Sequence, residues 1–275
     1  MKTRVITGIV GILLLIPVFI FSDTFVLNIA VALLSLFAVI ELLKCTRISR
    51  ILALLIPSLL YSVIFPVFFQ SSYKYMYTFS MTYVFVMLVI GVVLSTKIST
   101  VKICTATLLT LFATNGLSSL IYLRGLSCGL YLLLLVFLGA WSTDVFGLLG
   151  GKFFGQHKLC PELSPKKTLE GAISSILACV IVFITYGIIC DAFFKVDANI
   201  FNLALCGIII SVSGILGDLT ASMIKRHFNI KDYSNILPGH GGIMDRFDSV
   251  IAIAPVLLLF VGRSDIFPLF IEVIL

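Results

Sequence analysis

The chain has 275 residues, of which 60% are hydrophobic and only 12% are charged. Soluble domains carry about 25% charged residues. This chain therefore has too little charge to cover a globular surface with polar groups, which excludes a soluble enzyme, a disordered protein and an extended nucleic-acid binder. We expect an all-α, polytopic integral membrane protein, because backbone that crosses lipid must satisfy its own hydrogen bonds. The net charge is only +6, so the positions of the charges carry more information than their sum.

Nine apolar runs follow one another along the chain, each close to the roughly 20 residues that a helix needs to cross the hydrocarbon layer. We therefore predict about nine transmembrane helices. They cover residues 5–21, 25–43, 51–69, 76–95, 103–122, 128–150, 171–190, 200–223 and 248–263. Only residues 22–24 separate the first two runs, which predicts a tight turn. The apolar tail, residues 266–275, is too short to span and is expected at the membrane interface.

The basic residues predict an orientation. With a cytoplasmic N-terminus and nine spans, 15 of the 19 Lys and Arg residues fall in segments on the cytoplasmic side. Lys74, Arg124, Lys195 and Arg263 fall on the opposite side. This asymmetry is what the positive-inside rule requires. A missed or false span would invert every later loop and remove the asymmetry.

One group of polar residues begins inside the sixth predicted span and continues into the loop after it. Asp144 interrupts an apolar run, and a carboxylate there should face the bundle interior or a wet cavity, as a functional group or as a structural hydrogen-bonding partner. In the loop, Ser164 and Pro165 are typical of the first residues of a helix. Such a helix start beside Lys166 and Lys167 would form an anion site, although a plain positively charged loop is the alternative.

A second group lies at the end of the eighth predicted span and the start of the ninth. Asp218, Ser222 and Lys225 are spaced i, i+4, i+7, which places them on one helix face. Asp245 and Asp248 are spaced i, i+3 and share a face of the ninth helix. Between the two helices, a Gly-His-Gly-Gly turn at residues 239–242 allows backbone to approach a ligand closely.

Carboxylates on two helix ends beside Lys and Arg suit a site for Mg²⁺ and phosphate. Mg²⁺ prefers hard oxygen ligands, usually one or two carboxylates completed by substrate phosphates and water. Lys and Arg neutralise phosphoryl oxygens. The alternative is a set of salt bridges that joins helix ends. His240 by itself is as consistent with a turn residue as with a catalytic one.

These segments resemble the phosphatidate cytidylyltransferase family, also called CDP-diglyceride synthetases. The strongest likeness runs from Ser222 to Asp248, and the stretches 217–219, 164–171 and 155–159 and Asp144 resemble the family as well. The resemblance covers about residues 139–260. One departure is Leu148, where the family often has tyrosine. We expect a single membrane domain, 1–275, with generic apolar helices in 1–125 and the catalytic helices and loops in 126–263.

The resemblance implies a reaction in phospholipid biosynthesis: CTP and phosphatidic acid give CDP-diacylglycerol and pyrophosphate, with Mg²⁺ required. We expect an integral enzyme of the inner (cytoplasmic) membrane whose active site faces the cytoplasm. No nucleic acid is expected as a partner. Two metal ions and a homodimer are both compatible with the family.

We expect the following roles for the residues that match. Asp218 and Asp245 would be the metal ligands, and Asp144 and Asp248 would support them or bind a second metal ion. Lys225 and Arg226 would complete the catalytic group by binding phosphate oxygens. The expected substrate-binding residues are Lys166, Lys167, Ser222, Gly239, His240, Gly241, Gly242 and Arg246.

Two other functions remain open from the sequence. Another membrane lipid enzyme, such as a CTP-dependent polyprenol kinase, would release CDP instead of pyrophosphate. A transporter or channel would use Asp144 and Asp218 to line a path. Transport predicts ionisable residues near the middle of several spans, whereas nearly all of these residues cluster at one face of the predicted bundle.

Overall fold

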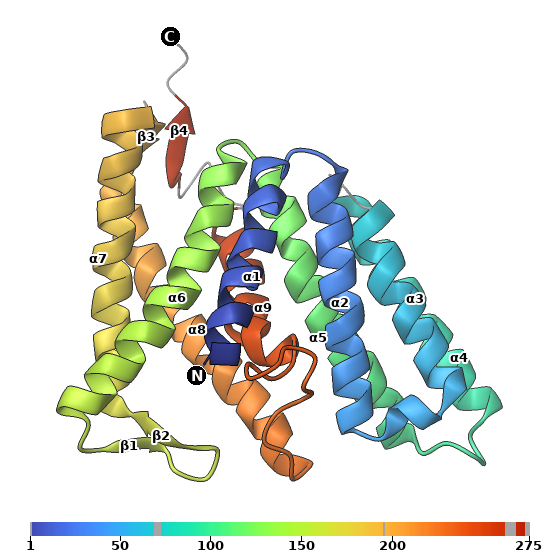
Figure 1. The fold of residues 1–275 in the computed structure, drawn as a ribbon. Helices are drawn as coiled ribbons and strands as arrows, with labels where there is room; N and C mark the ends of the chain where they lie inside the picture. Colours follow the sequence, from blue (N-terminus) through green and yellow to red (C-terminus); the bar gives the residue numbers. More distant parts are fainter. Residues whose placement is uncertain (1, 69–72, 195, 262–267, 273–275) are drawn as a thin grey trace. The chain divides into compact units, whose positions relative to one another are not determined.

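The computed structural model describes residues 2–68, 73–194, 196–261 and 268–272 (Figure 1). Within these residues the chain forms nine α-helices. They are α1 Lys2–Ile20, α2 Phe25–Cys45, α3 Leu52–Phe68, α4 Tyr73–Val93, α5 Thr100–Arg124, α6 Gly129–Phe154, α7 Leu169–Phe194, α8 Ile200–His227 and α9 Met244–Val261. Lys195, Arg263 and half of the apolar tail (266, 267 and 273–275) lie outside the described residues. All nine predicted spans coincide with a helix, which confirms the all-α fold class.

Six of the described helices are long and apolar enough to cross a membrane: α2, α4 (from Met76), α5, α6, α7 and α8. α3 is apolar but shorter, with 17 residues. α9 carries Asp245, Arg246 and Asp248 at its start, so its apolar part is also short. The protein is thus an integral membrane protein by helix length and composition, and the count of nine spans stays a prediction.

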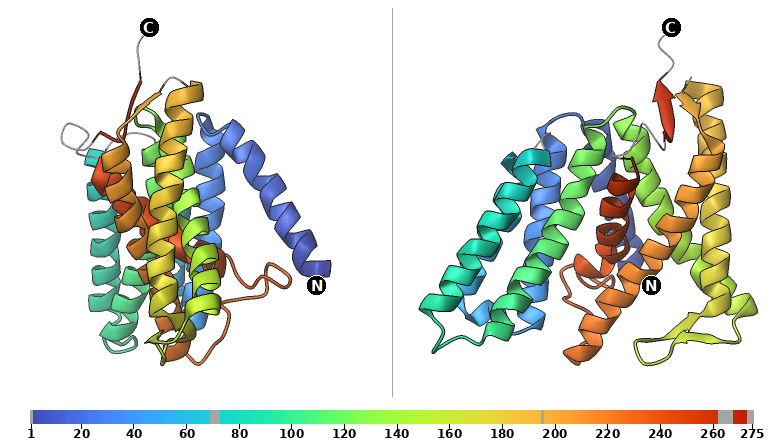
Figure 2. Two further views of the ribbon diagram at one scale, coloured as in Figure 1. Left: turned by 90° about the vertical axis from the view of Figure 1, so that its left-hand side faces the viewer. Right: turned by 180° about the vertical axis from the view of Figure 1, so that it is seen from behind.

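The chain divides into two compact units, which are described separately. The N-terminal unit contains Met1–Gly125 and His227–Phe247, and the C-terminal unit contains Leu126–Arg226 and Asp248–Leu275. In the N-terminal unit, α2, α3, α4 and α5 pack side by side (Figures 1 and 2). The turn before α2 is as predicted, and the Thr24 hydroxyl accepts a hydrogen bond from the Val26 amide at 3.3 Å as the helix N-cap.

Polar side chains join the helices of the N-terminal unit. The buried Asn28 amide of α2 donates to the Pro66 carbonyl of α3 at 2.8 Å. The Tyr61 hydroxyl of α3 donates to Asn115 Oδ1 of α5 at 2.7 Å. Hydrogen bonds of this kind hold helices together in lipid, where apolar side chains gain little by leaving a hydrocarbon solvent. Asn115, a polar residue within the apolar α5, therefore has a structural role.

In the C-terminal unit, α6 and α7 pack closely along small residues. A Cβ atom added to Gly171 would lie 2.7 Å from the Gly147 carbonyl oxygen and 3.2 Å from the Gly151 Cα. The Ser175 hydroxyl donates to the Thr143 carbonyl at 2.9 Å, which adds a hydrogen bond across the same contact. Glycine at these positions lets the two helix backbones approach each other.

Two short antiparallel strand pairs complete the C-terminal unit, and the first of them is a hairpin. The first consists of β1, Lys158–Cys160, and β2, Ser164–Thr168, between α6 and α7. The second consists of β3, Val196–Ala198, and β4, Phe270–Glu272. In it, Phe270 packs on a small apolar cluster with Cys128, Cys190 and Val196.

The structure of the first hairpin shows that one sequence prediction, a helix start at Ser164, is wrong. Ser164 and Pro165 begin β2 and do not begin a helix. α7 starts at Leu169, and the Thr168 hydroxyl accepts a hydrogen bond from the Gly171 amide at 3.1 Å, so Thr168 has the N-cap role. Pairing of β1 with β2 occupies the residues before α7, which explains why the helix begins at Leu169, four residues later than the predicted start at Pro165.

Candidate active site

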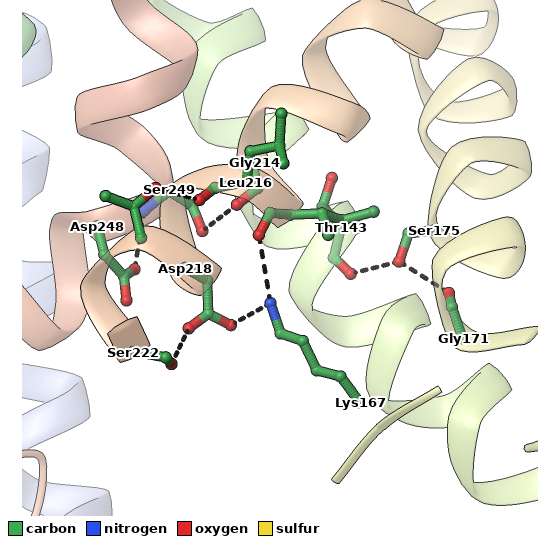
Figure 3. A network of polar contacts seen from close by, with 12 residues as sticks. Thr143, Lys167, Gly171, Ser175, Gly214, Leu216, Asp218, Ser222, Asp248 and Ser249 are labelled. Atoms are coloured by element: carbon green, nitrogen blue, oxygen red, sulfur yellow. Dashed lines mark hydrogen bonds and ion pairs between the residues drawn. The ribbon is translucent and has the colours of Figure 1, made fainter. Parts of the chain in front are cut away.

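Asp218 lies at the centre of a polar cluster in the C-terminal unit. It sits in the last third of α8, where its Oδ1 accepts a hydrogen bond from the Ser222 hydroxyl at 3.4 Å. This contact confirms the shared helix face that the i, i+4 spacing predicts. Figure 3 shows the Asp218 carboxylate between Ser222 and Lys167.

Lys167 brings the first hairpin to this carboxylate. Its Nζ lies 2.6 Å from Asp218 Oδ2 and 3.5 Å from the Ile215 carbonyl oxygen (Figure 3). Both side chains of the pair are partly exposed, 24% for Lys167 and 31% for Asp218, so a ligand can reach them. Lys166 points elsewhere on the same strand and is exposed. The sequence predicts the same anion-binding role for both lysines, whereas in the structure it is Lys167 that contacts Asp218.

Further charges surround Asp218. Asp248 in the first turns of α9 is buried, and its Oδ1 accepts the Ser249 amide at 2.8 Å. Asp218 and Asp144 are near enough to repel the Asp248 charge, and Lys225 is near enough to attract it. Asp144 itself is exposed on α6 and so does not point into the helix packing. The cluster therefore gathers three of the four predicted carboxylates and two of the three predicted lysines.

Close backbone packing holds the cluster in place. A Cβ atom on Gly217 would lie 2.6 Å from the Asp248 carbonyl oxygen, so only glycine permits this approach of α8 to the chain at Asp248. The Ser249 hydroxyl also donates to the Gly214 carbonyl at 3.3 Å. Arg226, at the end of α8, donates through Nε to the Leu163 carbonyl at 3.3 Å and so contacts the hairpin turn.

The other predicted site residues belong to the N-terminal unit, in the segment before α9 and in the first turn of α9. Gly239 and Gly241 have φ angles of 80° and 84°, which a residue with a side chain adopts only with strain. The His240 amide donates to the Leu237 carbonyl at 2.8 Å, and Arg246 Nε donates to the His240 carbonyl at 2.7 Å. The predicted glycine turn is confirmed, and Arg246 fixes it from the helix.

Asp245 also organises this segment. Its Oδ2 accepts hydrogen bonds from the Tyr233 amide at 2.8 Å and the Gly242 amide at 3.0 Å. A Cβ atom on Gly241 would lie 2.9 Å from the same oxygen. Asp245 thus has a structural role in the turn, whatever its part in metal binding. Because Asp218 and Asp245 belong to different units, their joint role as metal ligands stays a prediction from the sequence.

The sequence analysis missed Glu41. This residue lies near the end of α2 and is 1% exposed. Its two oxygens accept hydrogen bonds from the amides of Ile243 at 3.0 Å and Met244 at 2.8 Å. A carboxylate inside a predicted span is the signal that identified Asp144, and it applies to Glu41 as well.

A second missed contact supports the first hairpin. The Glu170 carboxylate, at the start of α7, accepts hydrogen bonds from the amides of Gln156 at 3.1 Å and His157 at 3.2 Å. His157 Nδ1 lies 2.7 Å from the same carboxylate. This contact fixes the end of α6 against the start of α7 and so sets where the hairpin with Lys167 emerges.

The clustered groups suit a magnesium-phosphate site. In the part of the chain that the structure describes, no three His, Cys, Asp or Glu side chains form a group able to hold a metal ion alone. Two carboxylates with hard oxygens and a nearby lysine are nonetheless what Mg²⁺ uses when substrate phosphates and water complete its coordination. The donor set therefore fits Mg²⁺ bound together with a phosphate substrate.

Comparison with known proteins agrees with this chemistry. The family model of the cytidylyltransferase family matches residues 2–263. A protein of Staphylococcus haemolyticus named phosphatidate cytidylyltransferase is 43% identical over 142 residues, 52% of this chain and 53% of that protein. Proteins of the same name from Rickettsia bellii and Staphylococcus aureus are 42% and 41% identical over 151 residues, and these matches cover 64% and 56% of their lengths.

The matched segment thus spans little more than half the length of these curated relatives. The family model extends much further, over nearly the whole of the chain. The chain belongs to the cytidylyltransferase family.

Proposed function

We propose that this protein is a phosphatidate cytidylyltransferase that converts CTP and phosphatidic acid into CDP-diacylglycerol and pyrophosphate. The observation that carries the proposal is the cluster of Asp218, Asp248 and Lys167 in a membrane protein of the cytidylyltransferase family. The relatives named phosphatidate cytidylyltransferase support the choice of substrates.

The reaction joins two phosphate groups. A phosphate oxygen of phosphatidic acid attacks the α-phosphorus of CTP and forms the new P–O bond. The bond between the α-phosphorus and its bridging oxygen breaks, and that oxygen leaves with pyrophosphate. The attacking oxygen is already anionic, so little help from a general base is required. Catalysis should depend mainly on positioning and on neutralising negative charge.

The residues of the C-terminal unit can supply both effects. Lys167 is held by Asp218 and the Ile215 carbonyl, so its ammonium group is placed in advance for phosphoryl oxygens. Lys225 adds a second positive charge on the same face of α8. Asp218 and Asp248 would hold Mg²⁺, which when bound would neutralise the triphosphate and orient it.

The other proposed binding residues lie outside this cluster. Lys166 and Arg226 would extend the positive surface along the hairpin, and Gly239 to Gly242 would allow backbone to approach the nucleotide. Asp245 would be a further metal ligand, as the sequence predicts. These assignments rest on the resemblance and on the positions of the residues in each unit.

We further propose that the protein works in the bacterial inner membrane, with these residues facing the cytoplasm. The asymmetry of the basic residues supports that orientation. So does the hairpin, because Lys158, Lys166 and Lys167 all lie between α6 and α7 and must share one side of the membrane. The proposal of a homodimer rests on the family resemblance alone. A measurement of the mass of the detergent-solubilised protein would test this oligomeric state.

The proposal is tested by incubating purified protein with CTP and phosphatidic acid, with Mg²⁺ or with EDTA. We expect CDP-diacylglycerol and an equal amount of pyrophosphate with Mg²⁺, and neither product with EDTA. Formation of a CDP-lipid without divalent metal would contradict the metal assignment. No CDP-lipid under either condition would overturn the proposed function.

A further inference from the structure

Glu41 has an unusual place for an acidic residue. It lies four residues before the end of α2, a helix that is otherwise apolar enough to cross a membrane. A carboxylate in such a position is costly unless it is well hydrogen bonded. Here it is 1% exposed; Oε1 accepts hydrogen bonds from the segment before α9, and Oε2 accepts one from Met244, the first residue of α9. Glu41 is thus buried with its acceptor capacity in use.

The contacts of Glu41 replace a missing helix cap. The backbone hydrogen bonds of α9 begin at the Ile243 carbonyl, which accepts from the Arg246 and Phe247 amides. Ile243 is therefore the N-cap residue, but its side chain has no oxygen with which to cap the helix. Glu41 Oε1 accepts the Ile243 amide and Oε2 accepts the Met244 amide. A negative charge at this end is also favoured by the helix dipole.

Glu41 also binds the beginning of the same segment. The Ser234 hydroxyl donates to Oε1, so one carboxylate joins residues on both sides of the glycine turn. Asp245, in the first turn of α9, makes a similar connection between Tyr233 and Gly242. Residues 233–244 are therefore held by two carboxylates, one from α2 and one from α9.

The Glu41 carboxylate leaves little space for a side chain at position 242. A Cβ atom there would lie 2.5 Å from each Glu41 oxygen. Among the described glycines only Gly239 and Gly241 have positive φ, so the backbone of Gly242 does not itself demand glycine. A side chain at 242 would instead require the Glu41 carboxylate to shift from the amides whose hydrogen bonds it accepts.

We propose that Glu41 is a positioning residue for the reaction, and this inference rests on the proposed function. It acts by fixing residues 234–244, and with them the start of the helix that carries Asp245, Arg246 and Asp248. It touches neither the substrate nor the reacting atoms. The carboxylate also occupies the amides at the start of α9, so those amides bind Glu41 and are not offered to a substrate phosphate.

Glu41→Gln is the first test because it keeps the side-chain volume while one acceptor oxygen becomes an NH₂ group. That group would face an amide donor, and the buried amide would lose its partner. We expect kcat to fall by about tenfold or more, as is common when a residue that orients site residues is changed. Amide hydrogen exchange in residues 234–244 should become faster, while exchange in α5 and the thermal midpoint change little.

Asn28→Leu is the matched control. Asn28 is equally buried on the same helix, but it donates to the Pro66 carbonyl of α3 and has no hydrogen bond to residues 234–244. It should lower the thermal midpoint without faster exchange in residues 234–244 and without a fall in kcat of the folded protein. If Asn28→Leu reproduces the effects of Glu41→Gln, Glu41 is a structural residue only.

A double-mutant cycle tests the contact itself. Gly242→Ala should reduce kcat strongly in the natural background because its Cβ atom meets the Glu41 carboxylate. In a Glu41→Ala background the added loss should be about threefold or less, because residues in direct contact are not additive. Full additivity of the two changes, or unchanged exchange and kcat in Glu41→Gln, would overturn the proposal. The exchange measurement needs no turnover, so it tests Glu41 even if the protein makes no CDP-lipid.

Discussion

The position of Lys167 in the hairpin determines that this lysine, and not its neighbour Lys166, contacts Asp218. Lys167 and Lys166 are neighbours in β2, and the alternation of a strand sends their side chains in opposite directions. Only Lys167 reaches Asp218, at 2.6 Å. Because both groups of this pair are partly exposed, the ion pair itself contributes little to stability. Its main effect is to hold the ammonium group where phosphate would bind.

Lys167→Ala should therefore lower activity far more than stability. We expect kcat to fall by about 100-fold, which is typical when one group that stabilises charge in the transition state is removed. The thermal midpoint in detergent should change little. Lys158→Ala, which removes an exposed lysine from β1 of the same hairpin, is the control and should keep most of the activity. Similar activities of the two variants would contradict the role of Lys167.

Individual site residues were predictable where a helix fixes the spacing. Asp218 and Ser222 share a face because they are one turn apart, and their hydrogen bond follows from this. Lys167 and Asp218 are far apart in the sequence, so no local rule could have paired them. Glu41 could have been suspected as a charge in an apolar run, but its partners at residues 234–244 become neighbours only through tertiary folding.

Among the elements, α6 and α7 are in contact through backbone packed directly against backbone. Gly171 faces the backbone of Gly147 and Gly151, and backbone cannot move aside as a flexible side chain can. This contact lies next to the hairpin, so a change in it would move β2 as well. The small residues are therefore as necessary to the site as the charged ones.

Gly171→Ala should destabilise the protein, even though alanine is the better helix former. We expect a loss of about 1–3 kcal/mol, the usual cost of overpacking. Gly11→Ala in α1 is the control, because a Cβ atom there would meet nothing within 4 Å. It should be neutral or slightly stabilising. Thermal unfolding in detergent checks both, and equal midpoints would show that the helix contact is looser than described.

Helices and hairpins differ in how far they could be predicted. Every long apolar run became a helix, because a chain in lipid has few other ways to satisfy its backbone. The first hairpin was not foreseen, since Ser164 and Pro165 are equally typical of a helix start. Strand pairing between residues 158–160 and 164–168 decides the outcome, and pairing is a property of two segments that neither shows alone.

At the scale of the whole molecule, the positions of the few charged residues indicate how the chain is oriented in the membrane. The end of α2, with Glu41, contacts the segment before α9 within the N-terminal unit. These two segments must therefore lie on one side of the membrane, as the positive-inside assignment requires. The nine-span topology stays a prediction, and it can be made from the sequence because the rule depends on counting basic residues and not on detailed packing.

Single-cysteine variants can test this topology. Cysteines placed at residues 97 and 158 should react with a membrane-impermeant maleimide only in inside-out vesicles. A cysteine at residue 124 should react only in right-side-out vesicles or intact cells. All three would be made in a background without the seven natural cysteines. Reaction of residues 97 and 124 from the same side would contradict the predicted nine-span arrangement.

The central claim is that a cytidylyl group, and not a single phosphoryl group, passes from CTP to the lipid. It is tested most directly by supplying purified protein, Mg²⁺ and phosphatidic acid with CTP labelled at either the α- or the γ-phosphorus. We predict that the α-label enters the lipid product and the γ-label is released in pyrophosphate. Transfer of the γ-label to the lipid would identify a kinase and contradict the account.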